Sequence, residues 1–303
     1  MHIFMTGATG YIGGSVAAAL IRQGHKVTGL VRSEERAAEA RTLGIEPVPG
    51  SLDDPNVLTA GAQGADAVIH TADAEHGASA DALTAALAGT GRRLLHTSGS
   101  SIVGRPDGGG KSDDVFDEAT EFTPSPARAS RVAIGERVLE SAADGVHAVV
   151  VCPSLIYGLG RGATRHSMQV PMMIDLARKD GTAKFIGAGE NIWSNVHIDD
   201  LVDLYLLALE KAPAGAFYFV ENGENAMRET SDAINRMLGI GTPAESMSED
   251  YAASQWGEGP ARNSMGSNSR VRAVRAREEL GWAPHRPSLI EEIETGCYAS
   301  AYP

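Results

Sequence analysis

The sequence predicts an α/β fold, in which a doubly wound parallel sheet is combined with a small C-terminal substrate-binding region. Strand-like and helix-like segments alternate from the first residue, and this alternation implies βαβ crossovers between parallel strands. The segment GVHAVVVC at 145–152 is almost continuously apolar, which is typical of a strand buried on both faces. A length of 303 residues accommodates one large domain, or one domain with a small appendage.

Six strands are predicted in the N-terminal half, each a short apolar run. They cover residues 2–6, 25–31, 45–49, 65–71, 92–98 and 145–152. Helical spacing of apolar residues predicts helices over 11–23 and 33–43, which end at Gly24 and Gly44.

After Pro153 the pattern loosens into helices separated by glycine-rich loops. The helices predicted there cover residues 170–179, 199–211 and 228–238. Residues 104–121 and 247–270 are rich in glycine and polar residues, and we expect both to form long irregular loops.

The stretch TGATGYIGG at residues 6–14 follows the first strand and opens the first helix, a context that indicates a dinucleotide-binding turn. Gly7 permits the tight turn, Gly10 lets the backbone approach a pyrophosphate, and Gly13 lets the helix lie close to the strand. The helix N-terminus adds N–H donors and a positive dipole. The residues predicted to bind the cofactor here are Thr6, Gly7, Thr9, Gly10, Tyr11, Ile12 and Gly13.

The end of the second strand favours NADP(H) over NAD(H), although NAD(H) remains possible. Enzymes that use NAD usually place a carboxylate there for the ribose 2′-hydroxyl. This chain has Arg32 and Ser33, with Arg36 one helical turn later, and these groups suit a 2′-phosphate. Residues 51–53 are expected beside the adenine ring, namely Ser51, Leu52 and Asp53.

These features predict a Rossmann-type dinucleotide-binding domain over residues 1–153, with returning segments near 183–220. Residues 154–303 are expected to form mainly a substrate-binding or cap region that is integral to the same fold.

The composition argues against a nucleic acid or an anionic membrane as a partner, because the formal net charge is −13 and the pI is about 5.1. Cys152 and Cys297 are the only cysteines and suit a reducing compartment, so a cytoplasmic location is expected. A small-molecule substrate is the expected partner. A homodimer through helices near 81–88 or 131–142 is possible by analogy with relatives.

The chain resembles the extended short-chain dehydrogenase/reductase family, also called the NAD-dependent epimerase/dehydratase family. The resemblance rests on TGATGYIG at 6–13, ADAVIHTAD at 65–73, LLHTSGSSIVG at 94–104 and CPSLIYGLG at 152–160. It continues through NIWSNVHIDDL at 191–201 and LGWAPHRPSL at 280–289. It implies that further residues contact the cofactor, namely Thr71, Ala72, Thr97, Ser98, Pro153, Leu155 and Ile156.

The chain departs from the family at its catalytic pair, Tyr-x-x-x-Lys, in the helix that begins near Ser125. In that pair the tyrosine transfers a proton and the lysine lowers the tyrosine pKa. One register aligns Ala127 and Arg131 with the pair, and another aligns Arg128 and Val132. No tyrosine in the chain is followed by a lysine four residues later.

Three residues are candidates for catalysis in place of the missing pair. Ser100 lies near the position of the family's catalytic hydroxyl and is expected to point into the cleft. Arg131 retains a cation where the lysine would contact ribose, and Tyr157 is a possible substitute acid beside the nicotinamide. His166, in the next loop, faces either a substrate or bulk solvent. The pattern contains no expected metal site.

The favoured function is NADP(H)-dependent hydride transfer to or from a small organic carbonyl, alcohol or imine compound. A non-catalytic NADP(H)-binding sensor or regulatory protein is the first alternative, because the cofactor motif is intact and the catalytic pair is absent. A sugar-nucleotide epimerase or dehydratase is the second alternative, although these reactions need a base close to the sugar ring.

Overall fold

The computed structural model describes residues 1–302 and shows a seven-stranded parallel sheet, which confirms the predicted doubly wound α/β fold. The strand order is β3-β2-β1-β4-β5-β6-β10, and the order reverses between β1 and β4. The strands are β1 (His2–Thr6), β2 (Lys26–Val31), β3 (Glu46–Pro49), β4 (Ala67–His70), β5 (Arg93–Thr97), β6 (His147–Pro153) and β10 (Ala216–Val220).

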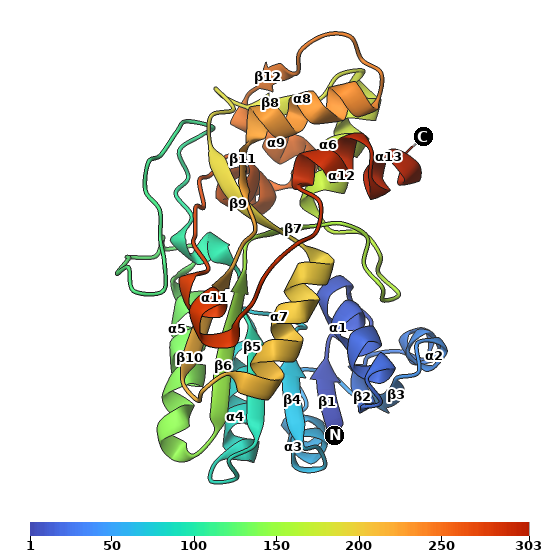
Figure 1. Ribbon diagram of the computed structural model, residues 1–303, viewed down its shortest axis with the longest axis vertical. Coiled ribbons are helices and arrows are strands. Elements are labelled where there is room, and N and C mark those ends of the chain that lie inside the picture. The colour runs from blue at the N-terminus through green and yellow to red at the C-terminus, as the bar shows by residue number, and fades with distance from the viewer. Residues whose placement is uncertain (303) are drawn as a thin grey trace.

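Helices cover both faces of this sheet (Figure 1). Each face has its own apolar core, because strands that are covered on both sides bury side chains in both directions. One core includes side chains of α1 (Tyr11–Arg22), α2 (Glu34–Thr42), α7 (Ile198–Lys211) and α11 (Val274–Leu280). The opposite core includes side chains of α3 (Pro55–Gln63), α4 (Gly77–Leu87) and α5 (Ala129–Glu140).

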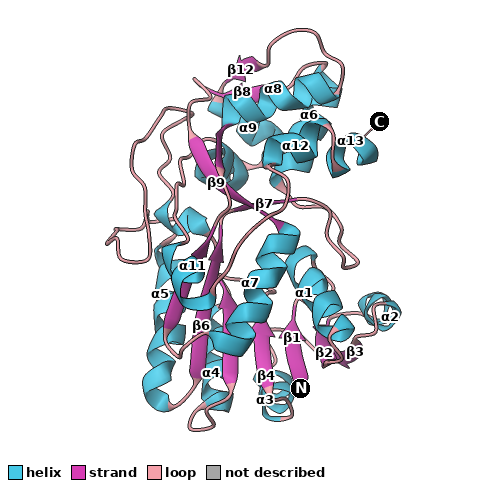
Figure 2. Cartoon of the chain, viewed as in Figure 1, coloured by secondary structure: helices cyan, strands magenta, loops and turns pink. Residues whose placement is uncertain are grey.

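The remaining elements form an upper region above the sheet (Figure 2), with a separate apolar core. One small sheet joins β7 (Leu155–Tyr157), β9 (Ile192–His197) and β11 (Glu224–Ala226), and another pairs β8 (Lys184–Ile186) with β12 (Glu245–Met247). The helices of this region are α6 (Gln169–Asp180), α8 (Met227–Met237), α9 (Glu249–Trp256), α10 (Glu258–Pro260), α12 (Leu289–Glu294) and α13 (Cys297–Ala301).

The returning segment expected near 183–220 is divided between the two regions. Residues 198–220 supply α7 and β10 to the large sheet and its helical layer. Residues 184–186 instead pair with β12, and the side chains of Phe185 and Ile186 are buried in the core of the upper region.

The expectation of an irregular loop over 247–270 is wrong for most of its length, because α9 spans Glu249–Trp256 and further helical turns cover residues 258–265. Ser248 caps this helix, since its hydroxyl accepts the N–H of Tyr251 at 3.1 Å. The other predicted loop, 104–121, is irregular but attached to the later segment. Its backbone N–H groups at Arg105 and Phe116 donate to the carbonyls of Asn268 and Arg270, each at 2.9 Å.

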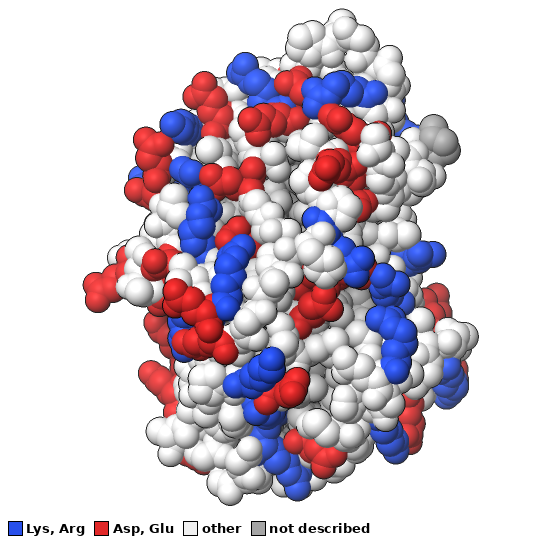
Figure 3. Space-filling view, viewed as in Figure 1, with Lys and Arg blue, Asp and Glu red and all other residues white. Residues whose placement is uncertain are grey.

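The topology places the loops after β1, β4, β5 and β6 together, because parallel strands present their carboxyl ends at one edge of the sheet. This edge faces the upper region (Figure 1). Acidic and basic side chains are interspersed over the face drawn in Figure 3, without a broad field of either sign. Within residues 1–302, no helix combines the length and apolar character that crossing a bilayer requires.

Candidate active site

The turn between β1 and α1 is shaped to receive a phosphate group. Gly7 has φ of 70°, a left-handed conformation that favours glycine. A side chain at Gly13 would overlap the carbonyl oxygen of Gly7. The N-cap of α1 is Gly10, so no side chain caps the helix, and its first turn contains no acidic residue. The first N–H groups of α1 are therefore available to an anion such as the pyrophosphate of a dinucleotide.

A cavity of about 510 Å³ extends from this turn toward the ends of β2 and β3. Many of the residues predicted to bind the adenosine half of the cofactor line it together. Its lining residues include Gly7, Thr9, Gly10, Arg32, Arg36, Ser51, Leu52, Asp53 and Ala72. The cavity is also lined by Asp73, His76 and Thr164, which sequence reasoning missed. Asp73 ends the motif at 65–73, whereas His76 and Thr164 lie in segments without a motif.

The three residues at the end of β2 have different surroundings. Arg32 is exposed and, among residues 1–302, has no hydrogen-bond or ion-pair partner. Arg36 already pairs with Glu39 at 2.7 Å. Ser33 caps α2 by accepting the N–H of Arg36 at 3.2 Å. Arg32 is therefore the guanidinium that is unengaged at this end of the cavity.

Asp53 lines the same cavity as these arginines and forms interactions of its own. Its carboxylate accepts a hydrogen bond from the Ser51 hydroxyl at 3.1 Å and lies 3.0 Å from Nε2 of His76. These hydrogen bonds, that of His76 first, lower the pKa of Asp53. The interaction joins the loop after β3 to the loop after β4, and thereby fixes both sides of this end of the cavity.

A second cavity, of about 550 Å³, continues from the same turn toward the ends of β4 and β6. It shares Gly10 and Ala72 with the first cavity, so the two form one path along the edge of the sheet. Its other lining residues are Tyr11, Ile12, Gly13, Thr71, Ser154, Ile156, His166, Ser167, Met168 and Gln169.

Five predicted cofactor residues lie below or beside this path rather than on its walls. The hydroxyl of Thr6 is 2.5 Å from Nδ1 of His70, and the hydroxyl of Thr97 is 2.6 Å from that of Tyr205, both in the interior. Pro153 is buried at the end of β6, and the Leu155 side chain is buried in the core of the upper region. Ser98 lines a separate pocket of about 200 Å³ beside α5.

The catalytic helix of the family corresponds to α5, and its contacts favour one of the two registers. Arg131 donates to the Ser101 hydroxyl at 3.0 Å and to Glu75 at 2.8 Å, near the end of β5. Val132 instead packs in an apolar cluster with Phe122. These contacts favour the register that aligns Ala127 and Arg131 with the catalytic pair, in which Ala127 lies in the turn before α5.

Two of the predicted catalytic side chains are directed into the interior. Ser100 was expected to face the cleft, but it is 1% exposed and its hydroxyl lies 2.9 Å from that of Ser269. Tyr157 is fully buried and donates to the carbonyl of Pro287 at 2.8 Å, while burial raises its pKa. Both hydroxyls belong to contacts that join distant segments of the chain, and neither lines the path described above.

Residues 158–168 form a segment that crosses the glycine-rich turn, drawn as the yellow-green loop near α1 in Figure 1. The N–H of Thr164 donates to the carbonyl of Thr9 at 3.2 Å, and Gly162 packs directly against Gly14 of α1. Arg161 pairs with Asp199 at 2.7 Å and fixes the start of this crossing. Residues of this segment thereby line part of the path.

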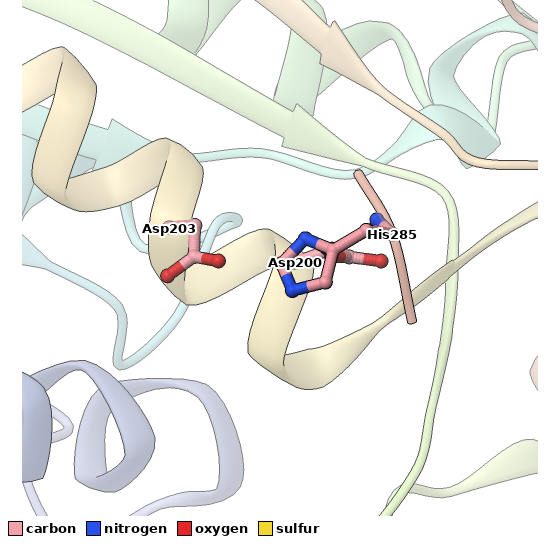
Figure 4. A group of neighbouring side chains, drawn as sticks. All are labelled: Asp200, Asp203 and His285. Carbon is pink, nitrogen blue, oxygen red and sulfur yellow. Dashed lines mark hydrogen bonds and ion pairs between the residues drawn. The ribbon is translucent and has the colours of Figure 1, made fainter. Parts of the chain in front are cut away.

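Asp200, Asp203 and His285 bring possible metal ligands within 4.8 Å of one another at α7 (Figure 4). The carboxylate of Asp200 is fully buried and accepts the backbone N–H groups of His285 and Arg286 at 3.0 and 3.1 Å. These bonds attach the chain near residue 285 to α7. We therefore interpret this cluster as a structural connection.

The fold, the uncapped glycine-rich turn and the continuous path along the sheet edge define an NAD(P)-binding oxidoreductase of the short-chain dehydrogenase/reductase class. The chain belongs to the NAD dependent epimerase/dehydratase family, whose model matches residues 3–220.

Curated relatives extend this result over most of the chain. The oxidase ucsJ of an Acremonium species is 33% identical, with 96% of this chain and 95% of the relative covered. A 2-alkyl-3-oxoalkanoate reductase of Stenotrophomonas maltophilia is 30% identical, and the match covers 80% of this chain and 77% of the relative. A third relative, from Stigmatella aurantiaca, is named 4-hydroxy-2-methyl-3-oxo-4-farnesyl-3,4-dihydroquinoline-1-oxide ketoreductase. It is 29% identical, and the match covers 74% of this chain and 69% of the relative.

Among solved structures, dTDP-glucose 4,6-dehydratase of Bacillus anthracis in complex with NAD superposes with a TM-score of 0.79. The two chains are 17% identical, and the match covers 100% of this chain and 96% of the other. At this identity the likeness shows the fold alone.

Proposed function

We propose that the protein is an NADPH-dependent reductase of small organic carbonyl compounds. The observation that carries the choice of NADPH is the end of β2, where Arg32 is exposed and unpaired and where residues 32 and 33 include no carboxylate. A guanidinium attracts a 2′-phosphate, whereas a carboxylate would repel it. Ser33 adds a hydroxyl beside it, although that hydroxyl also caps α2.

The residues along the path have separate roles in this proposal. The first N–H groups of α1 bind the pyrophosphate, and Ala72 and Ile156 border the nicotinamide half. When bound, the reduced nicotinamide supplies the hydride. Residues of the segment 158–168 border this part of the path.

The proposed substrates are ketones that carry alkyl substituents. Ile156 and Met168 give the second cavity an apolar portion, and no lysine or arginine lines it. Two relatives are named for the reduction of 3-oxo compounds, an alkyl-3-oxoalkanoate and a farnesylated 3-oxoquinoline. A ketone flanked by an alkyl group fits both observations.

Calorimetric titration with NADPH and NADH, followed by an NADPH-consumption assay, tests the proposal. We expect clear preference for NADPH, and oxidation of NADPH by ethyl 2-methyl-3-oxobutanoate or phenanthrenequinone. Preference for NADH would overturn the choice of cofactor. Tight NADPH binding without consumption by either carbonyl compound would favour the alternative of a non-catalytic sensor, which the alanine at the tyrosine position also supports.

A further inference from the structure

The second cavity contains one side chain that is suited to replace the missing catalytic tyrosine. We propose that His166 is the general acid of the reaction, and that its imidazolium protonates the oxygen of the carbonyl group being reduced. This inference rests on the proposed reductase function, because only a carbonyl reduction requires a proton at this point.

His166 lies at the right part of the path and is unengaged. It lines the second cavity together with Thr71, Ala72 and Ile156, the residues that border the nicotinamide half. Its side chain is exposed, and among residues 1–302 neither ring nitrogen has a hydrogen-bond partner. A general acid needs a free N–H directed to the substrate and access to solvent for reprotonation.

The hydroxyl groups on the walls of this cavity already form hydrogen bonds within the protein, and the amide of Gln169 is not a proton-transfer group. Thr71 donates to the carbonyl of Thr6 and Tyr11 donates to that of Gly158, each at 2.8 Å. Ser154 donates to a carbonyl at 2.9 Å, and the Ser167 hydroxyl is 3.2 Å from that of Tyr298. These hydrogen bonds would have to break before the hydroxyl groups could donate a proton to a substrate.

Histidine is the residue type suited to exchange a proton near neutral pH, and His166 is the only histidine that lines this cavity. The other titratable lining residue is Tyr11, and its burial raises its pKa well above the ordinary value. The cation nearest the position of the family's lysine, Arg131, does not release a proton near neutral pH. The acid therefore comes from the loop after β7 rather than from α5.

The position of the imidazole is set by two elements. The ring of Tyr302 contacts it edge-on with ring centroids 6.0 Å apart, and the guanidinium of Arg178 on α6 lies 5.2 Å from the centre of the Tyr302 ring. Arg165 precedes it in the chain, and Tyr11 faces it from α1 across the cavity. Asp175 on α6 also interacts with Tyr302, and among residues 1–302 no carboxylate forms an ion pair with His166.

The proton balance of the step is complete with these groups. As the carbonyl carbon accepts the hydride, its C–O π pair becomes localised on oxygen and forms an O–H bond with the proton of the imidazolium. The neutral imidazole then takes a proton from bulk water, which its exposed position permits. The net result is an alcohol and the oxidised cofactor.

The test compares His166→Gln with the matched control His285→Gln, which removes an exposed imidazole that is remote from the path. We expect His166→Gln to bind NADPH normally by calorimetry but to reduce the single-turnover rate with ethyl 2-methyl-3-oxobutanoate by about 10²- to 10⁴-fold. The wild-type rate should decrease toward alkaline pH, as expected for a reaction that needs a proton donor, and this decrease should be absent from the variant. Added imidazole should partly restore His166→Ala, and the control should behave as wild type.

A second measurement does not depend on turnover. In protein with ¹³C-labelled histidine, the ring signal of His166 should shift when NADP⁺ and ethyl 2-methyl-3-hydroxybutanoate are added together, while that of His285 should not. An unchanged rate and pH profile in His166→Gln would overturn this inference and leave the reductase function standing. Failure of the wild-type protein to oxidise NADPH with either carbonyl compound would overturn both this inference and the proposed reductase function.

Discussion

Arg32 and Arg36 line the same end of the adenosine-side cavity, but only Arg36 is already paired with a carboxylate. A cation that is held by a neighbouring carboxylate has less to gain from a phosphate than one that is unpaired. The distinction cannot be made from the sequence, in which both are arginines at the start of a helix. It identifies Arg32 as the residue that should decide between the two dinucleotides.

Replacing Arg32 with alanine should weaken NADPH binding by about 1.5–3 kcal/mol, the range for a charge-assisted hydrogen bond, which corresponds to about 10- to 150-fold in Kd. NADH binding should change little, because NADH has no 2′-phosphate. Paired calorimetric titrations measure both values. Arg36→Ala is the matched control and should have the smaller effect, and equal losses for the two nucleotides would contradict the assignment.

Tyr157 illustrates a residue whose role follows from its partner rather than from its motif. Removal of its hydroxyl in Tyr157→Phe leaves the carbonyl of Pro287 without its donor, and we expect the free energy of unfolding to fall by about 1–2 kcal/mol. The single-turnover rate of NADPH oxidation should stay close to wild type. Urea unfolding and a stopped-flow assay measure the two effects, and a large loss of rate at unchanged stability would return Tyr157 to the catalytic site.

At the scale of elements, α9 shows how a helix can be obscured by composition. Its sequence, EDYAASQW, lies in a polar stretch rich in serine and glycine, yet Ser248 supplies a cap and Glu249 and Asp250 follow in the first turn. Ser248→Ala should lower the free energy of unfolding by about 1 kcal/mol. Urea unfolding tests this, with Ser254→Ala, within the same helix, as the control. Equal effects of the two substitutions would show that the cap contributes nothing of its own.

The large sheet could be predicted because its evidence is local. Apolar runs such as 145–152 and the glycine spacing of residues 7–13 directly specify buried strands and a phosphate-binding turn. The short strands β8 and β12 span three residues each, and their pairing depends on segments about 60 residues apart, which no local pattern encodes. The orientation of Ser100 was missed for the same reason, since its partner is Ser269.

At the scale of the whole molecule, contacts between distant segments join the sheet domain to the upper region. Asp200, at the start of α7, accepts two backbone N–H groups from the segment near residue 285, and the carbonyl of Asp200 accepts the indole N–H of Trp282 at 2.8 Å. Segment 158–168 connects the regions on the side of the cofactor path. The walls of the cofactor path come from both regions, so its shape depends on these connections.

Two buried histidines beneath this path should make the stability of the whole molecule depend on pH. His70 and His96 lie on β4 and β5 with ring centroids 5.2 Å apart, and burial lowers their pKa values to about 3 and about 4. The ordinary value is near 6.5, so below this pH the unfolded chain binds more protons than the folded one. The free energy of unfolding should therefore fall as the pH decreases from 6.5 toward 4, by about 2 kcal/mol per histidine at pH 5.

Substitution of His96 separates this effect from the titration of other groups. Neither of its ring nitrogens has a hydrogen-bond partner in the part of the chain that the structure describes, so the substitution breaks no hydrogen bond there. His96→Leu should retain the fold at about pH 7, because it replaces an unpaired polar ring with an apolar side chain. On acidification to about pH 5, its free energy of unfolding should fall by about 2 kcal/mol less than that of the wild type. Urea unfolding at the two pH values measures both losses. The exposed His285→Gln should behave as wild type, and an equal loss in His96→Leu and wild type would show that His96 is not excluded from protonation by the fold.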